Sequence, residues 1–175
     1  MVDADATVKR LQRAGMPVFD DIVSHFGEEV IGADGELNRP RLAEIVFGDP
    51  DQLEAINKIV HPAVRKDMAR QRDELAATHE IIVLDIPLLI EGEQRLELAG
   101  IVVVDLPTEL AIERLVRFRG FDEADARARI ASQVDRQDRL ARADFVIDNS
   151  GGLDDLDLEV ARCWQWMIDI HRSAS

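Results

Sequence analysis

The chain has 175 residues, of which 21 are Lys or Arg and 35 are Asp or Glu, and its formal net charge is −14. This length fits one domain of about 100–200 residues, and the apolar fraction of 46% is sufficient for a core, which excludes general disorder. The strong acidity argues against general binding to nucleic acid or to anionic membranes.

No segment predicts export or membrane insertion. Residues 81–90 form the longest apolar run, which is about half a membrane span and contains Asp85. The N-terminus lacks the charged-then-apolar pattern of a secretory signal. Because Cys163 is the only cysteine and cannot form an internal disulfide, we expect a reducing, cytoplasmic setting.

Residues 4–30 are predicted to be helical, because their apolar residues recur at helical spacing. Gly15 and Pro17 are expected to divide this segment into two helices. Asp34-Gly35 then predicts a turn.

Further helices are predicted after this turn. Asn38 is a candidate N-cap for a helix that ends at residues 48–50. The next helix is expected to reach a joint at His61-Pro62, since a residue before proline avoids the α region. Residues 63–78 are polar and predicted to be helical.

Three short β-branched runs predict strands in the second half. Residues 80–85 and 100–105 have the composition of strands buried on both faces, as in a parallel sheet covered by helices, and residues 145–148 form the third. Alternation of strands with helices predicts an α/β fold with a parallel sheet. Helices are expected at 108–118, at 122–142 and from 153 to about 171, with a turn at 149–152.

Asp3 and Asp5 are the first candidate site residues. Alternate spacing at a strand end would place both carboxylates near the rim where α/β sheets bind ligands. A carboxylate there can take a proton from a hydroxyl group or hold magnesium. The alternative is a frayed acidic terminus without a functional role.

Asp85 is the second candidate, because it lies at the carboxyl end of a predicted strand and therefore in the ligand crevice of an open sheet. The residues that follow are open to two interpretations. Pro87 and Leu88 either line the site or serve to end the strand and fill the core. Glu91 is either a ligand-binding residue or an acid at a helix start.

Eight arginines and only five acidic residues lie between residues 114 and 142, so this segment is locally cationic in an acidic chain. Arginine binds phosphoryl oxygens through two parallel hydrogen bonds, and the cluster therefore predicts a phosphate site. The alternative is a solvated helix with i,i+4 ion pairs, such as Glu123 with Arg127 and Asp135 with Arg139. We expect both, with some arginines in such pairs and others on ligand. The arginines are 114, 117, 119, 127, 129, 136, 139 and 142.

Weaker candidates are His61, at the predicted helix joint, and the turn that contains Asn149 and Gly151. The histidine either contacts a ligand or is structural, and the turn either presents backbone groups to a base or is a plain turn. The sequence shows no cluster with metal-ligand spacing, no Ser/His/Asp order and no redox pair.

Taken in order, several segments resemble the dephospho-CoA kinase family, and the resemblance covers essentially the whole chain. Each segment is weakly specific alone, but the ordered set is specific. The segments are VDAD at 2–5, FGEEVIGADGELNR at 26–39, IVHPAV at 59–64, DIPLLIE at 85–91, RIASQ at 129–133 and ADFVIDNSG at 143–151.

The resemblance implies a P-loop NTPase-like parallel sheet with helices on both faces, within one domain of three parts. These are a helical acceptor-binding region at 6–78, a core at 79–118 and 143–175, and an arginine-rich lid at 119–142. The implied reaction transfers the γ-phosphoryl group of ATP to the ribose 3′-hydroxyl of dephospho-CoA with Mg²⁺, the last step of coenzyme A synthesis. A cytoplasmic monomer without nucleic-acid or membrane partners is expected.

The resemblance also implies residue roles. Asp5 is the expected base for the 3′-hydroxyl, and Arg119 and Arg139 are expected to neutralise the transferring phosphate. Arg114, Asn149 and Gly151 are expected on the ATP side. The residues expected on the acceptor side are Asp3, His61, Asp85, Pro87, Leu88 and Glu91.

One family motif is missing from the 175 residues, because no G-x-x-x-x-G-K-[ST] phosphate loop occurs in them. The family begins with a strand and this loop, and Met1 falls where the second strand would be ending. We expect a misassigned gene start, since an internal GTG valine codon read as a start is written Met. The alternative is a real truncation that leaves a non-catalytic protein binding a CoA-like ligand or a partner, and we do not expect the 175 residues alone to catalyse.

Overall fold

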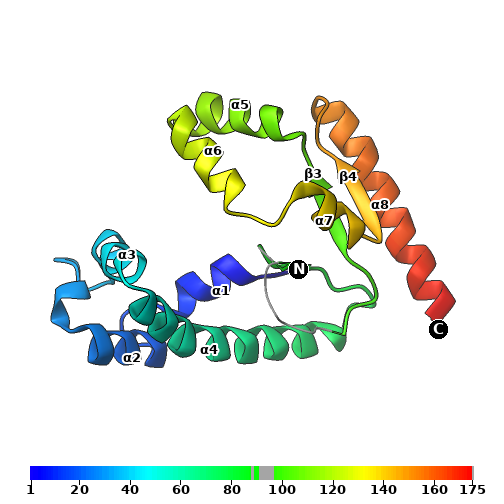
Figure 1. Cartoon of the computed structure of the whole chain (residues 1–175). Helices are drawn as coiled ribbons and strands as arrows, with labels where there is room; N and C mark the ends of the chain where they lie inside the picture. The colour runs from blue at the N-terminus through cyan, green and yellow to red at the C-terminus, as the bar shows by residue number, and fades with distance from the viewer. Residues whose placement is uncertain (88, 91–96, 175) are drawn as a thin grey trace. The chain divides into compact units, whose positions relative to one another are not determined.

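The computed structural model describes residues 1–87, 89–90 and 97–174, and these fall into two compact units, Met1–Pro87 and Leu88–Ser175. Parallel strand pairs and helices make up both units, as expected for an α/β protein (Figure 1). The predicted division into acceptor region, core and lid stays a prediction. None of the described helices combines the length and the apolarity that a membrane span requires.

The first unit places a short parallel strand pair beside a group of helices. Its elements are β1 Val2–Asp3, α1 Ala4–Leu11, α2 Pro17–Phe26, the 3₁₀ helix Glu28–Val30, α3 Arg39–Gly48, α4 Pro50–Ala76 and β2 Leu84–Asp85.

Apolar side chains from all of these helices form the core of the first unit. Ile22 and Val30 are fully buried within it. Helices α1, α2 and α3 all pack against α4, which Figure 1 shows as one long helix. The other buried core residues are Leu11, Val18, Phe19, Phe26, Leu37, Leu42, Val46, Ile56 and Val60.

Several local predictions for this unit are confirmed. Helices α1 and α2 are separated at Gly15, whose φ of 82° is in the left-handed region that glycine adopts without strain. The Asn38 side chain caps α3 by accepting a hydrogen bond from the Arg41 amide at 3.1 Å. The turn at Gly35 has a φ of 79° and lies between Ile31 and Leu37, which form an antiparallel bridge.

The predicted joint at His61-Pro62 is wrong, because α4 runs without interruption from Pro50 to Ala76. Proline removes one backbone donor from the helix. Ile56 and Val60, in the preceding turns, are buried in the core, and this packing keeps the chain helical through Pro62.

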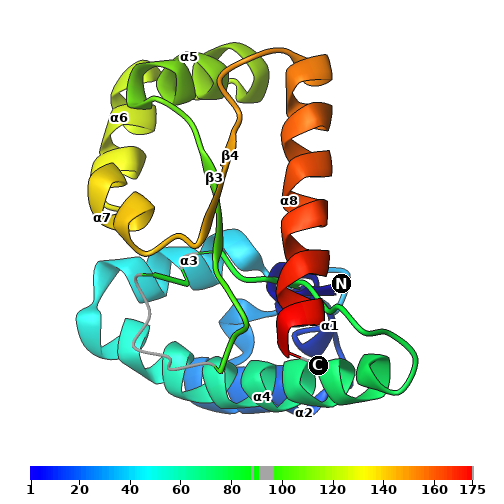
Figure 2. The same ribbon diagram turned by 90° about the vertical axis from the view of Figure 1, so that its right-hand side faces the viewer.

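The second unit contains the other strand pair. Figure 2 shows α8 running beside β4, against which it packs. The elements of this unit are β3 Val102–Asp105, α5 Thr108–Arg119, α6 Glu123–Ala131, α7 Arg136–Ala141, β4 Phe145–Asp148 and α8 Leu153–Ala174.

Two predictions for the second unit are wrong. The segment 122–142 is not one helix, because α6 ends at Ala131 and Asp135 starts α7 by accepting a hydrogen bond from the Gln137 amide at 2.7 Å. Strand β3 is not buried on both faces, since Val104 is 60% exposed. Among the described elements, α7 is the helix with appreciable contacts to β3, so part of this strand has no helical cover.

We expect Ile22→Ala to lower the free energy of unfolding by about 2–5 kcal/mol, because it leaves a cavity at a fully buried position. Phe47→Ala is the control in the same unit, since Phe47 is 79% exposed, and it should change the free energy by no more than about 0.5 kcal/mol. Urea unfolding followed by circular dichroism measures both. Equal losses in the two variants would contradict this description of the core.

Candidate functional site

The pairing of β1 with β2 places two predicted site residues side by side. The strands are parallel, Val2 pairs with Leu84, and Asp3 pairs with Asp85. Both aspartates end their strands, which is the edge where open α/β sheets bind ligands. Asp3 and Asp85 thus end neighbouring strands, whereas Asp5 lies in helix α1 and not at the end of a strand.

Asp3 and Asp5 differ in what their carboxylates do. Asp3 is the N-cap of α1, and its Oδ1 accepts a hydrogen bond from the Ala6 amide at 2.8 Å. Asp5 lies in the first turn of α1 and is exposed, and among the described residues its carboxylate has no recorded hydrogen bond or ion pair. Asp3 thus has a structural task already, while Asp5 is available to a ligand.

The other residues predicted on the acceptor side have no recorded contact with the aspartates at the strand ends in the described part of the chain. His61 is exposed on α4, and no contact is recorded between its side chain and Asp3, Asp5 or Asp85 in the described part of the chain. Pro87 lies in the turn directly after β2 and is exposed. The two remaining residues of this group, Leu88 and Glu91, lie outside the described residues.

Three residues predicted on the ATP side do meet in the second unit. Arg114, on α5, donates from Nη1 to the carbonyl oxygen of Asn149 at 2.8 Å and to its side-chain Oδ1 at 3.2 Å. Its Nη2 donates to the carbonyl oxygen of Gly151 at 3.1 Å. The Arg114 guanidinium therefore bonds both ends of the turn between β4 and α8, which is the predicted base-binding turn, and stabilises it.

Gly151 has a steric requirement of its own. A Cβ atom at this position would lie 2.6 Å from the Asp155 carboxylate, which accepts a hydrogen bond from the Gly152 amide at 3.0 Å. Any other residue would displace this carboxylate. The turn that Arg114 braces is thus also fixed by the start of α8.

The predicted phosphate-neutralising residues Arg119 and Arg139 lie at helix ends. Arg119 is the exposed last residue of α5, which Gly120 ends with a φ of 69°. Arg139, in α7, is half-buried and donates from Nη1 to the Val134 carbonyl oxygen at 2.5 Å. The predicted pair of Arg139 with Asp135 is not formed, since Asp135 caps α7 instead.

Other arginines of the cluster do form ion pairs. Arg127 bonds Glu123, as predicted, and also Glu109 on α5. These hydrogen bonds raise the pKa of Arg127, first from Glu109 and then from Glu123. Arg127 therefore fastens α6 to the start of α5.

One ion pair was not expected from the sequence. Asp105, at the end of β3, is only 8% exposed, and its two carboxylate oxygens accept from Arg136 Nε at 2.8 Å and Nη2 at 2.5 Å. A bidentate pair of this kind is strong and directional. It ties the first residue of α7 to the carboxyl end of β3, and its only sequence cue is an aspartate at a strand end.

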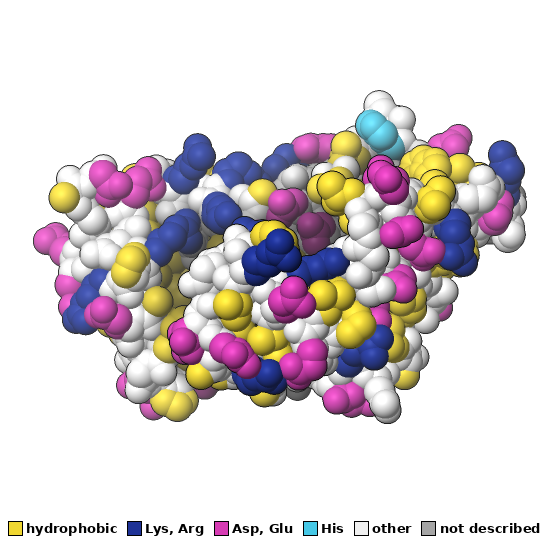
Figure 3. Space-filling view, turned by 90° about the horizontal axis from the view of Figure 1, so that it is seen from above, with side chains coloured by type: hydrophobic (Ala, Val, Ile, Leu, Met, Phe, Trp, Pro, Cys, Tyr) yellow, Lys and Arg dark blue, Asp and Glu magenta, His cyan; other side chains and the backbone are white. Residues whose placement is uncertain are grey.

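The remaining arginines have no recorded carboxylate partner within the described residues. Arg117 stacks over Phe118, and Arg129 stacks over Phe121. On the face drawn in Figure 3, basic and acidic side chains are interspersed, so the cationic groups form no uniform surface there. Of the arginines without a recorded acidic partner, Arg114 holds the turn at Asn149, and Arg142 donates from Nη1 to the Ile90 carbonyl oxygen at 2.9 Å. The others are 117, 119, 129 and 139.

The acidic residues of the described segments form no group of three or more that could hold a metal ion on their own. Mg²⁺ in phosphoryl-transfer sites is commonly held by one or two carboxylates together with substrate phosphates. Asp3 and Asp85 are in backbone register at the strand ends, but the Asp3 carboxylate already caps α1, so this pair is not assigned to a metal.

Comparisons with known proteins agree with one another. The family model for dephospho-CoA kinase matches residues 1–155. The dephospho-CoA kinase of Streptomyces avermitilis is 40% identical over 173 residues, which are 99% of this chain and 83% of that protein. The enzyme of Corynebacterium jeikeium is 41% identical over 167 residues, covering 94% of this chain and 84% of its own length.

Solved structures share the fold. The crystal structure of TT1252 from Thermus thermophilus has a TM-score of 0.74 and 27% identity, and the match covers 95% of this chain and 83% of that one. The dephospho-CoA kinase from Campylobacter jejuni has a TM-score of 0.69 at 23% identity, with 99% and 86% covered. The second likeness concerns the fold alone.

We expect Arg136→Ala to lower the midpoint of thermal unfolding by about 5 °C or more, because it leaves the carboxylate of Asp105 buried without its partner. Arg127→Ala is the matched control, since both of its acidic partners are exposed and the midpoint should stay within about 2 °C. Differential scanning calorimetry measures both. Equal shifts in the two variants would show that the buried Asp105–Arg136 pair contributes no more to stability than an exposed ion pair.

Proposed function

The chain belongs to the dephospho-CoA kinase family, and we propose that the protein expressed from its native locus phosphorylates the ribose 3′-hydroxyl of dephospho-CoA from ATP, with Asp5 as the base. This transfer yields coenzyme A and is the last step of its synthesis. The observation that carries the assignment of Asp5 is its exposed carboxylate, next to the Asp3–Asp85 edge and without a recorded partner in the described chain.

The proposed roles follow the demands of phosphoryl transfer, which needs positioning and charge stabilisation more than covalent chemistry. Asp5 orients the 3′-hydroxyl group and accepts its proton as the oxygen attacks the γ-phosphorus. Arg119 and Arg139 neutralise the charge that spreads over the transferring phosphoryl oxygens. The availability of both guanidinium groups, neither of which has a recorded carboxylate partner in the described residues, supports this role.

On the nucleotide side, we assign the adenine contact to the turn of Asn149 and Gly151. This assignment is supported by the hydrogen bonds from Arg114, which hold the turn in one conformation before ATP binds. Arg114 itself acts through this turn. Mg²⁺, when bound with the ATP phosphates, would supply further charge neutralisation.

On the acceptor side, the residues that stay proposed contacts of dephospho-CoA are Asp3, His61, Asp85, Pro87, Leu88 and Glu91. We also propose a cytoplasmic monomer with Mg²⁺ as its metal and neither nucleic acid nor membrane as a partner. The alternative of a non-catalytic protein that binds a CoA-like ligand is not favoured. The matched relatives are named dephospho-CoA kinases, and the match covers more than four-fifths of the length of each.

The direct test is conversion of dephospho-CoA to coenzyme A by the protein purified from its native cells. A kinase forms 3′-phosphorylated product only when ATP is present. A non-catalytic binder retains dephospho-CoA without converting it, and that outcome would overturn the proposal.

In the protein expressed from its native locus, we expect Asp5→Asn to lower kcat by about 100-fold or more, because the amide cannot accept the hydroxyl proton, while the affinity for ATP stays nearly unchanged. Steady-state kinetics and calorimetric titration with an ATP analogue measure the two quantities. Asp20→Asn, at an exposed acid on α2, is the control and should keep wild-type turnover. Loss of ATP binding in Asp5→Asn would contradict its role as the base.

Arg139→Ala should lower kcat on the order of 100-fold or more, as loss of an arginine that stabilises the transferring phosphate does. Arg162→Ala removes an exposed arginine on α8 that pairs with Glu159, and it should leave kcat unchanged. Both are measured at saturating ATP and dephospho-CoA. A small loss in Arg139→Ala would make Arg139 a helix-surface residue that only bonds Val134.

A further inference from the structure

The proposed base lies in the first turn of α1, which follows β1 directly, and three interactions fix this β1–α1 turn. Val2 donates its amide to the Val83 carbonyl oxygen at 2.9 Å. The Asp3 carboxylate caps α1 at the Ala6 amide. The Asp3 carbonyl oxygen accepts a hydrogen bond from Thr7 Oγ1 at 2.8 Å.

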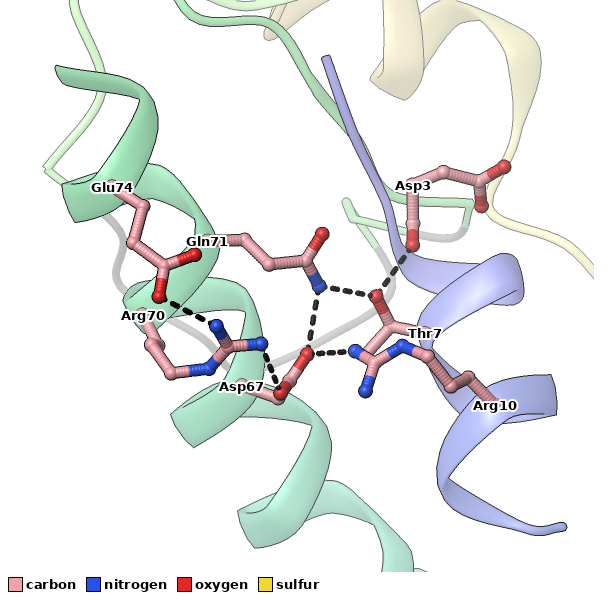
Figure 4. Close-up of polar contacts among 7 residues, drawn as sticks. All are labelled: Asp3, Thr7, Arg10, Asp67, Arg70, Gln71 and Glu74. Atoms are coloured by element: carbon pink, nitrogen blue, oxygen red, sulfur yellow. Dashed lines mark hydrogen bonds and ion pairs between the residues drawn. The ribbon is translucent and has the colours of Figure 1, made fainter.

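Thr7 connects this turn to helix α4. Its side chain is buried, and the residue is only 2% exposed. Thr7 Oγ1 donates to Asp3 and accepts from Gln71 Nε2 at 3.0 Å, as Figure 4 shows. Within the part of the chain that the structure describes, this hydroxyl group is the recorded link between the Gln71 amide and the backbone of Asp3.

Asp67 sets the orientation of the Gln71 amide. Gln71 Nε2 also donates to Asp67 Oδ2 at 2.7 Å, so the same nitrogen serves both bonds. Arg70 donates to the other oxygen of Asp67, Oδ1, at 2.9 Å. Arg10 forms an ion pair with Oδ2, the oxygen that Gln71 also contacts (Figure 4). With its carboxylate occupied in this way, Asp67 holds the amide nitrogen, and not the amide oxygen, toward Thr7.

The charge state of Asp67 favours the same arrangement. Burial by itself would raise the pKa of this carboxyl, but the hydrogen bonds from Arg70, Gln71 and Arg10 outweigh it and lower the pKa. The carboxylate therefore stays ionised at neutral pH. Its contribution to stability is present above the ordinary aspartate pKa and is lost as the pH falls through the lowered value.

We propose that Gln71 is a positioning residue, which acts through Thr7 to hold the β1–α1 turn so that Asp5 faces the acceptor hydroxyl. This inference rests on the proposed function. Gln71 has no contact with a reacting atom in this account, and its effect passes through two hydrogen bonds to the backbone two residues before Asp5. A displacement of about 1 Å at a reacting group can cost a hundredfold in rate, so such a link has a measurable consequence.

The test compares Thr7→Val, which keeps the shape of the side chain and removes the hydroxyl group, with Thr7→Ser, which keeps it. In the protein expressed from its native locus, Thr7→Val should lower kcat about tenfold or more and change the KM for ATP less than about twofold. Thr7→Ser should recover most of kcat. Gln71→Leu should match Thr7→Val.

Glu74→Gln is the control variant. Glu74 bonds Arg70 at the exposed end of the same group of residues, outside the link from Asp67 to Thr7 (Figure 4), and its replacement should keep wild-type kcat. All variants are assayed well below their unfolding midpoints, so that a loss of kcat does not report unfolding. Equal kcat in Thr7→Val, Thr7→Ser and wild type would overturn the proposal.

Amide hydrogen exchange gives a second readout that needs no turnover. Exchange over residues 2–8 should be several-fold faster in Thr7→Val than in wild type or Thr7→Ser, while exchange over α2 stays unchanged. Unchanged protection of residues 2–8 would overturn the link even if kcat falls. A wild-type protein that forms no coenzyme A would refute the proposed function instead, and the exchange result would still decide whether the link holds the turn.

Discussion

Parallel pairing of strands that all end in aspartate is the constraint around which the described site residues are arranged. Asp3 pairs with Asp85, and Asp105 pairs with Asp148 in backbone register, so each strand pair ends in two aspartates. Neighbouring like charges are unfavourable unless each is compensated. Asp3 is compensated by the start of α1, Asp105 by Arg136, and Asp148 by hydrogen bonds from Ser150 that lower its pKa. Among the described residues, three of the four strand-end carboxylates therefore have a recorded partner, and Asp85 is the exception.

Features encoded within one helical turn could be predicted from the sequence, and features that join distant segments could not. The cap at Asn38 is formed with a residue three positions away. By contrast, Asp105 and Arg136 are 31 residues apart, and Thr7 and Gln71 are 64 apart. Many arginines are equally plausible partners for a given aspartate until the tertiary structure brings one of them near. The strand ends therefore made Asp3 and Asp85 candidates, but the sequence did not indicate the partners of Asp105 or of Thr7.

The wrong helix boundaries have the same origin. The preference of the residue before Pro62 for extended backbone is local and weak compared with the burial of Ile56 and Val60, and the helix continues. Within 122–142, the charged pattern is compatible with one helix, but the Asp135 side chain satisfies an amide more directly as a cap than as an i,i+4 partner of arginine. Tertiary burial decided the first case and capping chemistry the second.

The continuity of α4 changes what its polar residues can do. A joint at Pro62 would have let the helix segment with Gln71 move independently of the segment that packs in the core. Since α4 is one helix, Gln71 lies about 15 Å from His61 along the same axis. Helix α4 thus carries both His61, a proposed acceptor contact, and Gln71, whose amide is bonded to Thr7 in the same helix as Asp5. The positions of the proposed base and of this acceptor contact therefore both depend on α4, which packs in the core through Ile56 and Val60.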